Sequence, residues 1–395
     1  MIVVGGVYRE VCQYPYWDRL FGSGLRAAAA VSELSPGTSL YAYAPRAWMD
    51  DIISSAAAFM VRAEITEFGR GIVFDYFHPL SAAAIDGAGA KAAPIKVDGD
   101  VVLRFGMIEG DAVVHAKHAV YDPQTGVSPE PFRESGSTAE HLAIVLNGWE
   151  AEQATGLPPH EAGELIMARE NAEAVIVKLG PQGAIVHAPG QAAILVPPHN
   201  ADSVFKIGSG DVFSAAFAHY WAEAFESPAK AAELASRSVA HFVDGHRLPL
   251  PPPAQLQHGD ALKPRDRARQ VYLAGPFFTI AQRWLVEETR DILSAMHIPV
   301  FSPLHDVGTA KRPDELAGLD LVGLEESSVV LALIDGADPG TLFEVGYARK
   351  SGIPVVVLTE QMASSNLTMF EGTGCVVAHD YTTAIYKTAF EAWSA

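Results

Sequence analysis

The chain has 395 residues, of which 49% are hydrophobic and 19% charged, so it can bury two domain cores and is not globally disordered. The formal net charge of −19 repels phosphate backbones and excludes a nucleic-acid polymer as an expected partner. Two cysteines make neither a zinc site nor a disulfide framework, which fits the reducing cytoplasm where we expect the protein. The sequence begins with a strand-like run that lacks signal-peptide features, and its alanine-rich stretches are too short for a membrane span.

The first part of the chain alternates apolar runs with helical patterns, which is typical of βαβ units and a mostly parallel sheet. The apolar runs predict four buried strands, at residues 2–4, 72–74, 143–146 and 174–179. A helix is expected over residues 209–223. A proline-rich segment that starts at Leu248 then removes backbone donors and stiffens the chain, as in an inter-domain linker. We therefore expect an α/β domain over 1–247, a linker over 248–269 and a second domain over 270–395.

The second domain repeats the alternation at smaller scale. We expect strands at 271–274, 299–301, 329–334 and 354–358, with helices over 280–296 and 342–350. In open α/β sheets, ligands bind beyond the carboxyl ends of the strands. The segment after the third strand carries Asp335, which we expect to serve the turn, and Asp338, and it places Glu344 in the first or second helical turn.

Glu344 is the main catalytic candidate. The positive end of a helix dipole favours an ionised carboxylate, and an ionised glutamate can attack an anomeric carbon. A second carboxyl group nearby could protonate the leaving group. An ordinary helix-stabilising glutamate is the alternative interpretation.

The order Tyr272, Asp320, Asp338 and Glu344-x-Gly-Tyr-Ala resembles the nucleoside 2-deoxyribosyltransferases. The resemblance implies a small flavodoxin/Rossmann-like parallel sheet without a cofactor, in which Glu344 attacks the sugar C1. Asp338 then handles the base, Asp320 matches the family's aspartate at the end of the preceding helix, and Tyr272 orients the nucleophile. A solvated helix residue is the alternative for Asp320, and packing alone is the alternative for Tyr272. The substrate-binding residues expected by position are Gly275, Pro276, Phe277, His305, Asp306, Gly340, Asn366 and Met369.

The resemblance leaves two outcomes open, because the family also contains hydrolases of nucleoside 5′-monophosphates. The sugar passes either to another base or to water, and both routes use the same glycosyl-enzyme intermediate. The segment Asn366-Leu-x-Met369 resembles one that completes a neighbouring subunit's site. We therefore expect a homo-oligomer that acts on a small nucleoside or nucleotide.

The N-terminal domain has a candidate anion site at Lys206-Ile-Gly-Ser-Gly-Asp211. Gly208 and Gly210 allow a tight turn, and the backbone N–H groups around Ser209 open a helix whose dipole favours phosphate. Asp211 could accept a proton from a sugar hydroxyl during phosphoryl transfer.

Together with the glycine turn at Phe21-Gly-Ser-Gly, the Asn147-x-x-Glu150 pair and Lys178-Leu-Gly-Pro-Gln-Gly, this motif resembles the ribokinase-like (PfkB-type) sugar and nucleoside kinases. The resemblance implies ATP and Mg²⁺ as cofactors. It assigns the sugar to Gly22 and Gly24, the metal to Asn147 and Glu150, and the nucleotide to Gly208, Ser209, Gly210, Lys178, Gly180 and Gly183.

The chain departs from the kinase pattern at four places, two of which are a short lid region and a segment after the catalytic helix that the linker truncates. Phe205-Lys-Ile stands where the family has Asp-Thr-Thr, and Glu10 replaces an early sugar-binding aspartate. We therefore keep two hypotheses for a fused nucleoside or nucleotide salvage enzyme that works at the N-glycosidic bond. Its first domain either phosphorylates a sugar or nucleoside, or binds a nucleotide as a regulatory or scaffold module without turnover.

Overall fold

The computed structural model describes residues 1–89, 91–256, 259–308 and 312–394. The chain divides into two compact units, Met1–Ala261 and Leu262–Ala395, named here the first and the second unit. The boundary lies within the segment for which a linker is expected. Within that segment Leu250 is buried in the first unit, where its N–H donates to the carbonyl of Ala30 at 2.9 Å.

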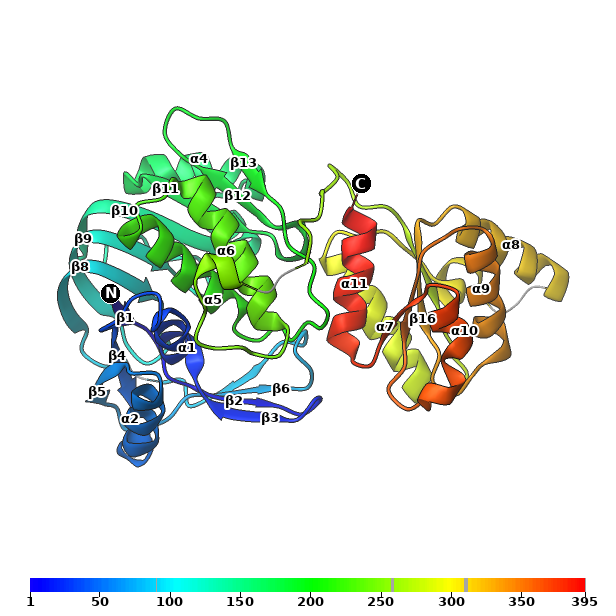
Figure 1. Ribbon diagram of the computed structural model, residues 1–395, viewed down its shortest axis with the longest axis horizontal. Helices are drawn as coiled ribbons and strands as arrows, with labels where there is room; N and C mark the ends of the chain where they lie inside the picture. Colours follow the sequence, from blue (N-terminus) through cyan, green and yellow to red (C-terminus); the bar gives the residue numbers. More distant parts are fainter. Residues whose placement is uncertain (90, 257–258, 309–311, 395) are drawn as a thin grey trace. The chain divides into compact units, whose positions relative to one another are not determined.

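The first unit contains a nine-stranded sheet in the order β13-β12-β11-β10-β9-β8-β1-β4-β5 (Figure 1). Seven of these strands, from β11 to β5 in that order, pair in parallel, and β12 and β13 complete the sheet as antiparallel strands. The strands are β1 Ile2–Val4, β4 Ser39–Ala44, β5 Arg62–Glu67, β8 Ile95–Phe105, β9 Ala112–Asp122, β10 Thr138–Asn147, β11 Ala174–Lys178, β12 Ala184–His187 and β13 Ile194–Val196.

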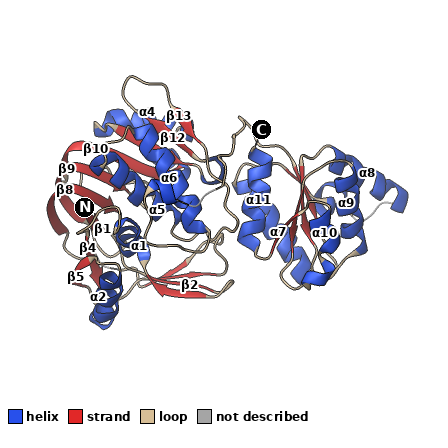
Figure 2. Ribbon diagram, viewed as in Figure 1, coloured by secondary structure: helices blue, strands red, loops and turns tan. Residues whose placement is uncertain are grey.

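Helices cover both faces of this sheet. Val175 and Val177 of β11 pack in a core with Ile166 of α4, whereas Ile176 between them points to the opposite face, because side chains alternate along a strand. Helices α5 and α6 lie across that opposite face (Figure 2). The α-helices are α1 Gly22–Val31, α2 Met49–Ala58, α3 Gly148–Thr155, α4 Pro159–Glu170, α5 Ser209–Ala218 and α6 Pro228–Val243. Short helical turns are η1 Arg46–Trp48, η2 Gly180–Gln182, the π-helical η3 His219–Glu223 and η4 Pro253–Gln255.

A second, four-stranded sheet of the first unit has the order β3-β2-β6-β7. Its strands are β2 Arg9–Cys12, β3 Trp17–Leu20, β6 Val73–Tyr76 and β7 Ala84–Asp86. β2 pairs in parallel with β6, and the two outer pairings are antiparallel. The sequence pattern predicted a strand near β6 but gave no indication of this sheet, because strands this short and half exposed carry little hydrophobic periodicity.

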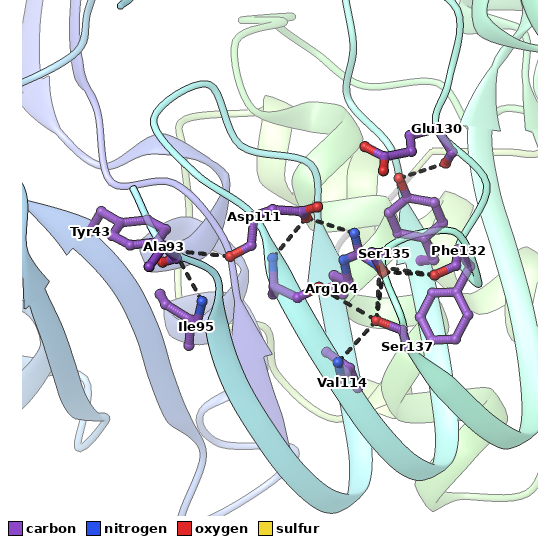
Figure 3. A network of polar contacts seen from close by, with 12 residues as sticks. Tyr43, Ala93, Ile95, Arg104, Asp111, Val114, Glu130, Phe132, Ser135 and Ser137 are labelled. Carbon is purple, nitrogen blue, oxygen red and sulfur yellow. Dashed lines mark hydrogen bonds and ion pairs between the residues drawn. The ribbon is translucent and has the colours of Figure 1, made fainter. Parts of the chain in front are cut away.

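A buried arginine, Arg104 on β8, joins several segments of the first unit (Figure 3). Its guanidinium is 1% exposed and forms an ion pair with Asp111 at 2.7 Å. It also donates to Ser135 Oγ at 2.8 Å and Ser137 Oγ at 3.1 Å, and lies over the ring of Tyr121. A buried cation needs such partners to offset its desolvation, so this network ties the β9–β10 connection to the sheet.

The second unit is a three-layer α/β structure around an all-parallel sheet in the order β15-β14-β16-β17-β18. In Figure 2, α7 and α11 lie on one side of the sheet, and α8, α9 and α10 lie on the other. The strands are β14 Val271–Ala274, β15 Val300–Phe301, β16 Val329–Leu333, β17 Val355–Leu358 and β18 Val376–Ala378. The helices are α7 Ile280–Ala295, α8 Pro313–Glu325, α9 Pro339–Lys350, α10 Thr368–Gly372 and α11 Tyr381–Trp393, with the turns η5 Pro303–Val307 and η6 Ser364–Asn366.

The predicted α/β class of both units is confirmed, and every strand and helix expected in the second unit is present within a few residues. None of the described helices is both long enough and apolar enough to cross a membrane.

Candidate active sites

The candidate site of the second unit lies where β14 faces helix α9. Helix α9 begins with Asp338 as its cap and Pro339 in its first turn, which places Glu344 in the second turn. The hydroxyl of Tyr272, on β14, donates to Oε1 of Glu344 at 2.6 Å. Tyr272 is fully buried and its ring stacks on Phe301 of β15, with centroids 5.5 Å apart. A rigid tyrosine therefore fixes the Glu344 carboxyl.

The pKa of Glu344 is raised from 4.5 to about 7, mainly by burial of the carboxyl. The Tyr272 hydrogen bond lowers this pKa, whereas the negative charges of Asp320 and Asp338 raise it further. The expectation that the helix dipole favours ionisation is therefore wrong in its net effect. Glu344 lies one turn inside the helix, where the dipole has weakened, and desolvation together with two like charges dominates.

The other carboxylates of this site differ in how they are held. Asp338 Oδ2 accepts from the backbone N of Thr341 at 2.8 Å and from its hydroxyl at 2.9 Å, so Asp338 caps α9. Asp320 of α8 is half-buried, which raises its pKa, and its Oδ1 is buried without a hydrogen-bond partner. Asp335 accepts from the hydroxyl of Thr359 at 2.7 Å and from the backbone N–H groups of Glu360 and Gln361, so it links the loop after β16 to the loop after β17.

Two expected substrate-binding residues are tied to neighbouring protein groups. His305 contacts Ser302 Oγ at 3.0 Å and Glu287 Oε2 at 2.9 Å, and Asp306 accepts from the backbone N of Ser302 at 2.8 Å. The remaining ones flank the site in sequence or lie on the surface. Gly275, Pro276 and Phe277 directly follow β14, Gly340 is in the first turn of α9, and the exposed Asn366 and Met369 lie in η6 and α10.

The candidate anion site of the first unit is the start of α5. Gly208 caps the helix in the left-handed region at φ 83°, and Ser209, Gly210 and Asp211 lie in its first turn. Gly22 and Gly24 lie at the start of α1, where the N–H of Gly24 donates to the carbonyl of Gly6 at 2.9 Å. Their lack of a side chain permits this close packing of the helix against the loop that follows β1.

Asp211 is held by Arg26 of α1. Arg26 is buried, donates to Asp211 Oδ2 at 2.7 Å and forms a second ion pair with Glu10. The other oxygen of Asp211 accepts from Gln124 at 2.6 Å. Burial alone lowers the pKa of Arg26, but the charges of Glu10 and Asp211 outweigh it, so the net shift is upward.

A second buried ion pair lies beside α5. Lys178, at the end of β11, donates to Asp122 Oδ2 at 2.6 Å, and the hydroxyl of Ser214 donates to the same oxygen at 2.6 Å. The other carboxylate oxygen, Asp122 Oδ1, is buried without a partner. Lys178 is therefore engaged with the protein, and Gly180 and Gly183 form the turn that follows it.

The pair expected to organise Mg²⁺ forms the N-terminal cap of α3. Asn147 Oδ1 accepts from the backbone N of Glu150 at 2.9 Å, and Glu150 accepts from the backbone N of Asn147 at 2.8 Å and of Thr125 at 3.0 Å. No group of three or more His, Cys, Asp or Glu side chains in the described part of the chain could hold a metal. Mg²⁺ usually keeps several waters and binds through one or two carboxylates plus substrate phosphates, so a role of Asn147 and Glu150 in holding it stays a prediction from the resemblance.

Arg26, Gln124 and Asp122 were not among the site residues expected from the sequence. A signal existed for Arg26, because it is the single charge in the run Gly-Ser-Gly-Leu-Arg-Ala-Ala-Ala-Ala, and a helix of such small residues is usually buried. Gln124 comes from a loop in which its φ is 42°, and no local pattern indicates its contact with Asp211, 87 residues away.

Family models match both units. The nucleoside 2-deoxyribosyltransferase model matches residues 271–381, and the pfkB family carbohydrate kinase model matches residues 135–246. A search of curated proteins found no significant match.

Solved structures of ribokinase-family kinases are similar to the chain at low identity. Ribokinase from Thermotoga maritima is 16% identical, with a TM-score of 0.47, and the match covers 65% of this chain and 95% of that one. Aminoimidazole riboside kinase from Salmonella enterica, in complex with aminoimidazole riboside and an ATP analog, is 14% identical, with a TM-score of 0.48 over 65% of this chain and 98% of that one. A pyrophosphate-dependent kinase in the ribokinase family, in complex with sulfate, gives 15% identity and a TM-score of 0.49, over 65% and 100%.

Both matched families consist of enzymes, and the chain is a fusion of a PfkB-type kinase domain with a nucleoside 2-deoxyribosyltransferase-like domain.

Proposed function

We propose that the second unit cleaves the N-glycosidic bond of a nucleoside or nucleotide through a covalent sugar on Glu344. In the first step a carboxylate oxygen of Glu344 bonds to the sugar C1 as the bond from C1 to the base nitrogen breaks, and the base leaves with a proton supplied by Asp320 or Asp338. In the second step water or an acceptor base attacks C1, the bond from C1 to Glu344 breaks, and the proton of the attacking group returns to that aspartate. The carboxylate needs no cofactor for either step.

The hydrogen bond between Tyr272 and Glu344, 2.6 Å long, is the observation that carries this proposal. It orients one carboxylate oxygen, while burial and the neighbouring aspartates keep the pKa of Glu344 about 7. A nucleophile with such a pKa is partly ionised at neutral pH and has been stripped of much of its water, which favours attack on a bound sugar. Asp320 and Asp338 are the candidates for protonating and positioning the base.

The kinase-like unit gives a reason for the fusion. Glycosidic cleavage releases a sugar or sugar phosphate, and PfkB-type proteins handle sugars and nucleosides. Its role is either phosphorylation with Asp211 as base, using ATP and Mg²⁺, or regulation of the second unit by a bound ligand. The ion pair that commits Asp211 to Arg26 favours the second role.

The test is release of free base from nucleosides and nucleoside 5′-monophosphates by the full-length protein, with and without an acceptor base. We expect Glu344→Gln to reduce release by about 10³-fold or more, since removing a catalytic nucleophile leaves only binding and electrostatic effects. Glu391→Gln, an exposed glutamate of α11, is the matched control and should retain wild-type activity. Full activity in Glu344→Gln would refute the assignment.

Comparing reactions with and without the acceptor base distinguishes a transferase from a hydrolase. A transferase forms a new nucleoside when the acceptor is present, whereas a hydrolase forms free sugar at the same rate with or without it.

A further inference from the structure

Helix α8 of the second unit contains two glycines with different surroundings. Both Gly318 and Gly323 lie inside the helix, where a glycine costs about 1 kcal/mol relative to alanine. Gly318 is exposed, and a Cβ placed on it would meet no described atom within 4 Å outside its own helical turn. Gly323 is buried, and a Cβ placed on it would lie 2.3 Å from Cζ of Phe301 and 2.4 and 2.5 Å from the two neighbouring ring carbons. The glycine at 323 therefore permits a close approach of an aromatic ring to the helix backbone.

The ring of Phe301 connects α8 to the tyrosine that holds Glu344. Phe301 ends β15 and pairs in register with Tyr272 of β14. The two rings are stacked, with centroids 5.5 Å apart and an interplanar angle of 16°. The far edge of the same phenylalanine ring contacts the backbone of Gly323. Phe301 therefore acts as a spacer between Tyr272 and α8.

Asp320 is carried by the same helix, three residues before Gly323. Residues three apart lie on one side of a helix, so Asp320 follows any movement of α8 at Gly323. Its Oδ1 is buried without a hydrogen-bond partner, so no hydrogen bond of this oxygen fixes the carboxyl group. The negative charge of Asp320 raises the pKa of both Tyr272 and Glu344. The strength of this effect depends on where α8 lies.

The sheet holds Phe301 more firmly than the protein holds the outer side of α8. Phe301 is fixed by its strand and by the stack on Tyr272, whereas Leu319 and Val322 of α8 are 41% and 51% exposed. Carbon atoms pack at about 3.5–4.0 Å, so a methyl group at position 323 needs about 1 Å more room than it has. We expect α8 to supply this room by moving outward.

We propose that Phe301 and Gly323 are positioning residues for the reaction at Glu344, because the contact of the ring with the glycine sets how close α8 brings Asp320 to Glu344. This inference rests on the function proposed for the second unit. It adds two residues that take no part in the bond changes themselves.

The experiment uses the full-length protein and four variants. Gly323→Ala adds the methyl group against the ring, and Gly318→Ala adds the same group to the same helix in open space as the matched control. Phe301→Leu shortens the ring side chain, and the double variant Phe301→Leu/Gly323→Ala combines both changes. Initial base release is measured across pH 5 to pH 10 with deoxyadenosine, deoxycytidine and their 5′-monophosphates, with adenine or cytosine as acceptor. Thermal unfolding shows whether each variant is folded.

Gly323→Ala should lower base release at the pH optimum by about tenfold or more, since a misplacement of about 1 Å can cost about 10²-fold. The rising limb of its pH profile should move to lower pH, because a more distant Asp320 raises the pKa of Glu344 less. Gly318→Ala should keep the rate and the limb of the wild type. The added methyl should cost less in the Phe301→Leu background, where the shorter side chain leaves room for it. If Gly323→Ala does not fold, the double variant is compared with Phe301→Leu alone.

Three results would overturn the proposal. The first is a Gly323→Ala variant with the rate and limb of Gly318→Ala. The second is a loss of rate without movement of the limb, or with movement to higher pH. The third is a loss from Gly323→Ala that is equally large, or a failure to fold, in the Phe301→Leu background. Failure of the proposed function is distinguishable, because Glu344→Gln would then release base like the wild type.

Discussion

Replacing Tyr272 by phenylalanine removes one hydroxyl and leaves the buried ring against Phe301. The hydroxyl donates to Glu344 at 2.6 Å and so stabilises its ionised form. A hydrogen bond to a charged group contributes about 1.5–3 kcal/mol, and one pKa unit corresponds to about 1.4 kcal/mol. The variant should therefore raise the pKa of Glu344 by about 1–2 units from its present value of about 7.

This shift has a sign that a pH–rate profile can test. If ionised Glu344 is the nucleophile, base release rises with pH as the carboxyl ionises, with a midpoint about 7 in the wild type. In Tyr272→Phe the rising limb should move about 1–2 pH units upward, so activity at pH 7 falls by roughly five- to fiftyfold and recovers near pH 9. The measurement is initial base release between pH 5 and pH 10, with thermal unfolding at each pH as a check on folding. An unshifted limb, a limb moved to lower pH, or a loss that is uniform across the range would refute this reasoning.

Three further predictions concern the same carboxylates. Asp320→Asn removes a negative charge that raises the pKa of Glu344, so the rising limb of base release should move to lower pH, opposite to Tyr272→Phe; movement in the same direction contradicts the electrostatic account. Asp338→Ala loses the cap of α9 and should lower the free energy of unfolding by about 1 kcal/mol in urea titrations, whereas Asp338→Asn keeps a good cap. Equal destabilisation by the two variants would contradict the capping role. Activity should fall in both variants. The folded-state pKa of Glu344 lies above its ordinary 4.5, so the folded protein binds more protons than the unfolded protein between pH 4.5 and about 7 and loses stability as pH rises through that window. In the wild type this lowers the free energy of unfolding by at most about 3 kcal/mol, and Glu344→Gln should remove that decline. An unchanged pH dependence of unfolding in the variant would contradict this.

Local patterns predicted strands β14 to β17 and helices α7 and α9 of the second unit, but gave no range for β18, α8, α10 or α11. Short runs of buried β-branched residues separated by amphipathic helices predict a parallel sheet, and the ends of its strands indicate where a site forms. Tyr272 and Glu344 were singled out by this placement together with the family resemblance, and they form a hydrogen bond in the structure. The sign of the Glu344 pKa shift was not predictable, because it depends on desolvation and on Asp320, whose distance from Glu344 in space is not encoded in sequence spacing.

The side-chain contacts at the start of α5 in the first unit were not predictable for the same reason. The start of α5 was predicted from Gly208-Ser-Gly-Asp. The ion pair between Arg26 and Asp211 was not predicted, because the two residues are 185 positions apart in the sequence. A short sequence motif predicts the local backbone conformation. It does not predict which side chains from distant parts of the sequence contact that backbone. The spacing of Asn147 and Glu150 is compatible with both a helix cap and a metal motif. The contacts in the structure are those of a helix cap.

The most direct test of the central claim is to trap the sugar on Glu344. The full-length protein is mixed with a nucleoside, quenched in acid at the time scale of one turnover, digested and analysed by mass spectrometry. We predict that the peptide containing Glu344 gains the mass of the glycosyl group on that residue, and that the adduct is absent in Glu344→Gln. Turnover with no adduct at any time, or an adduct on another residue, would contradict the account.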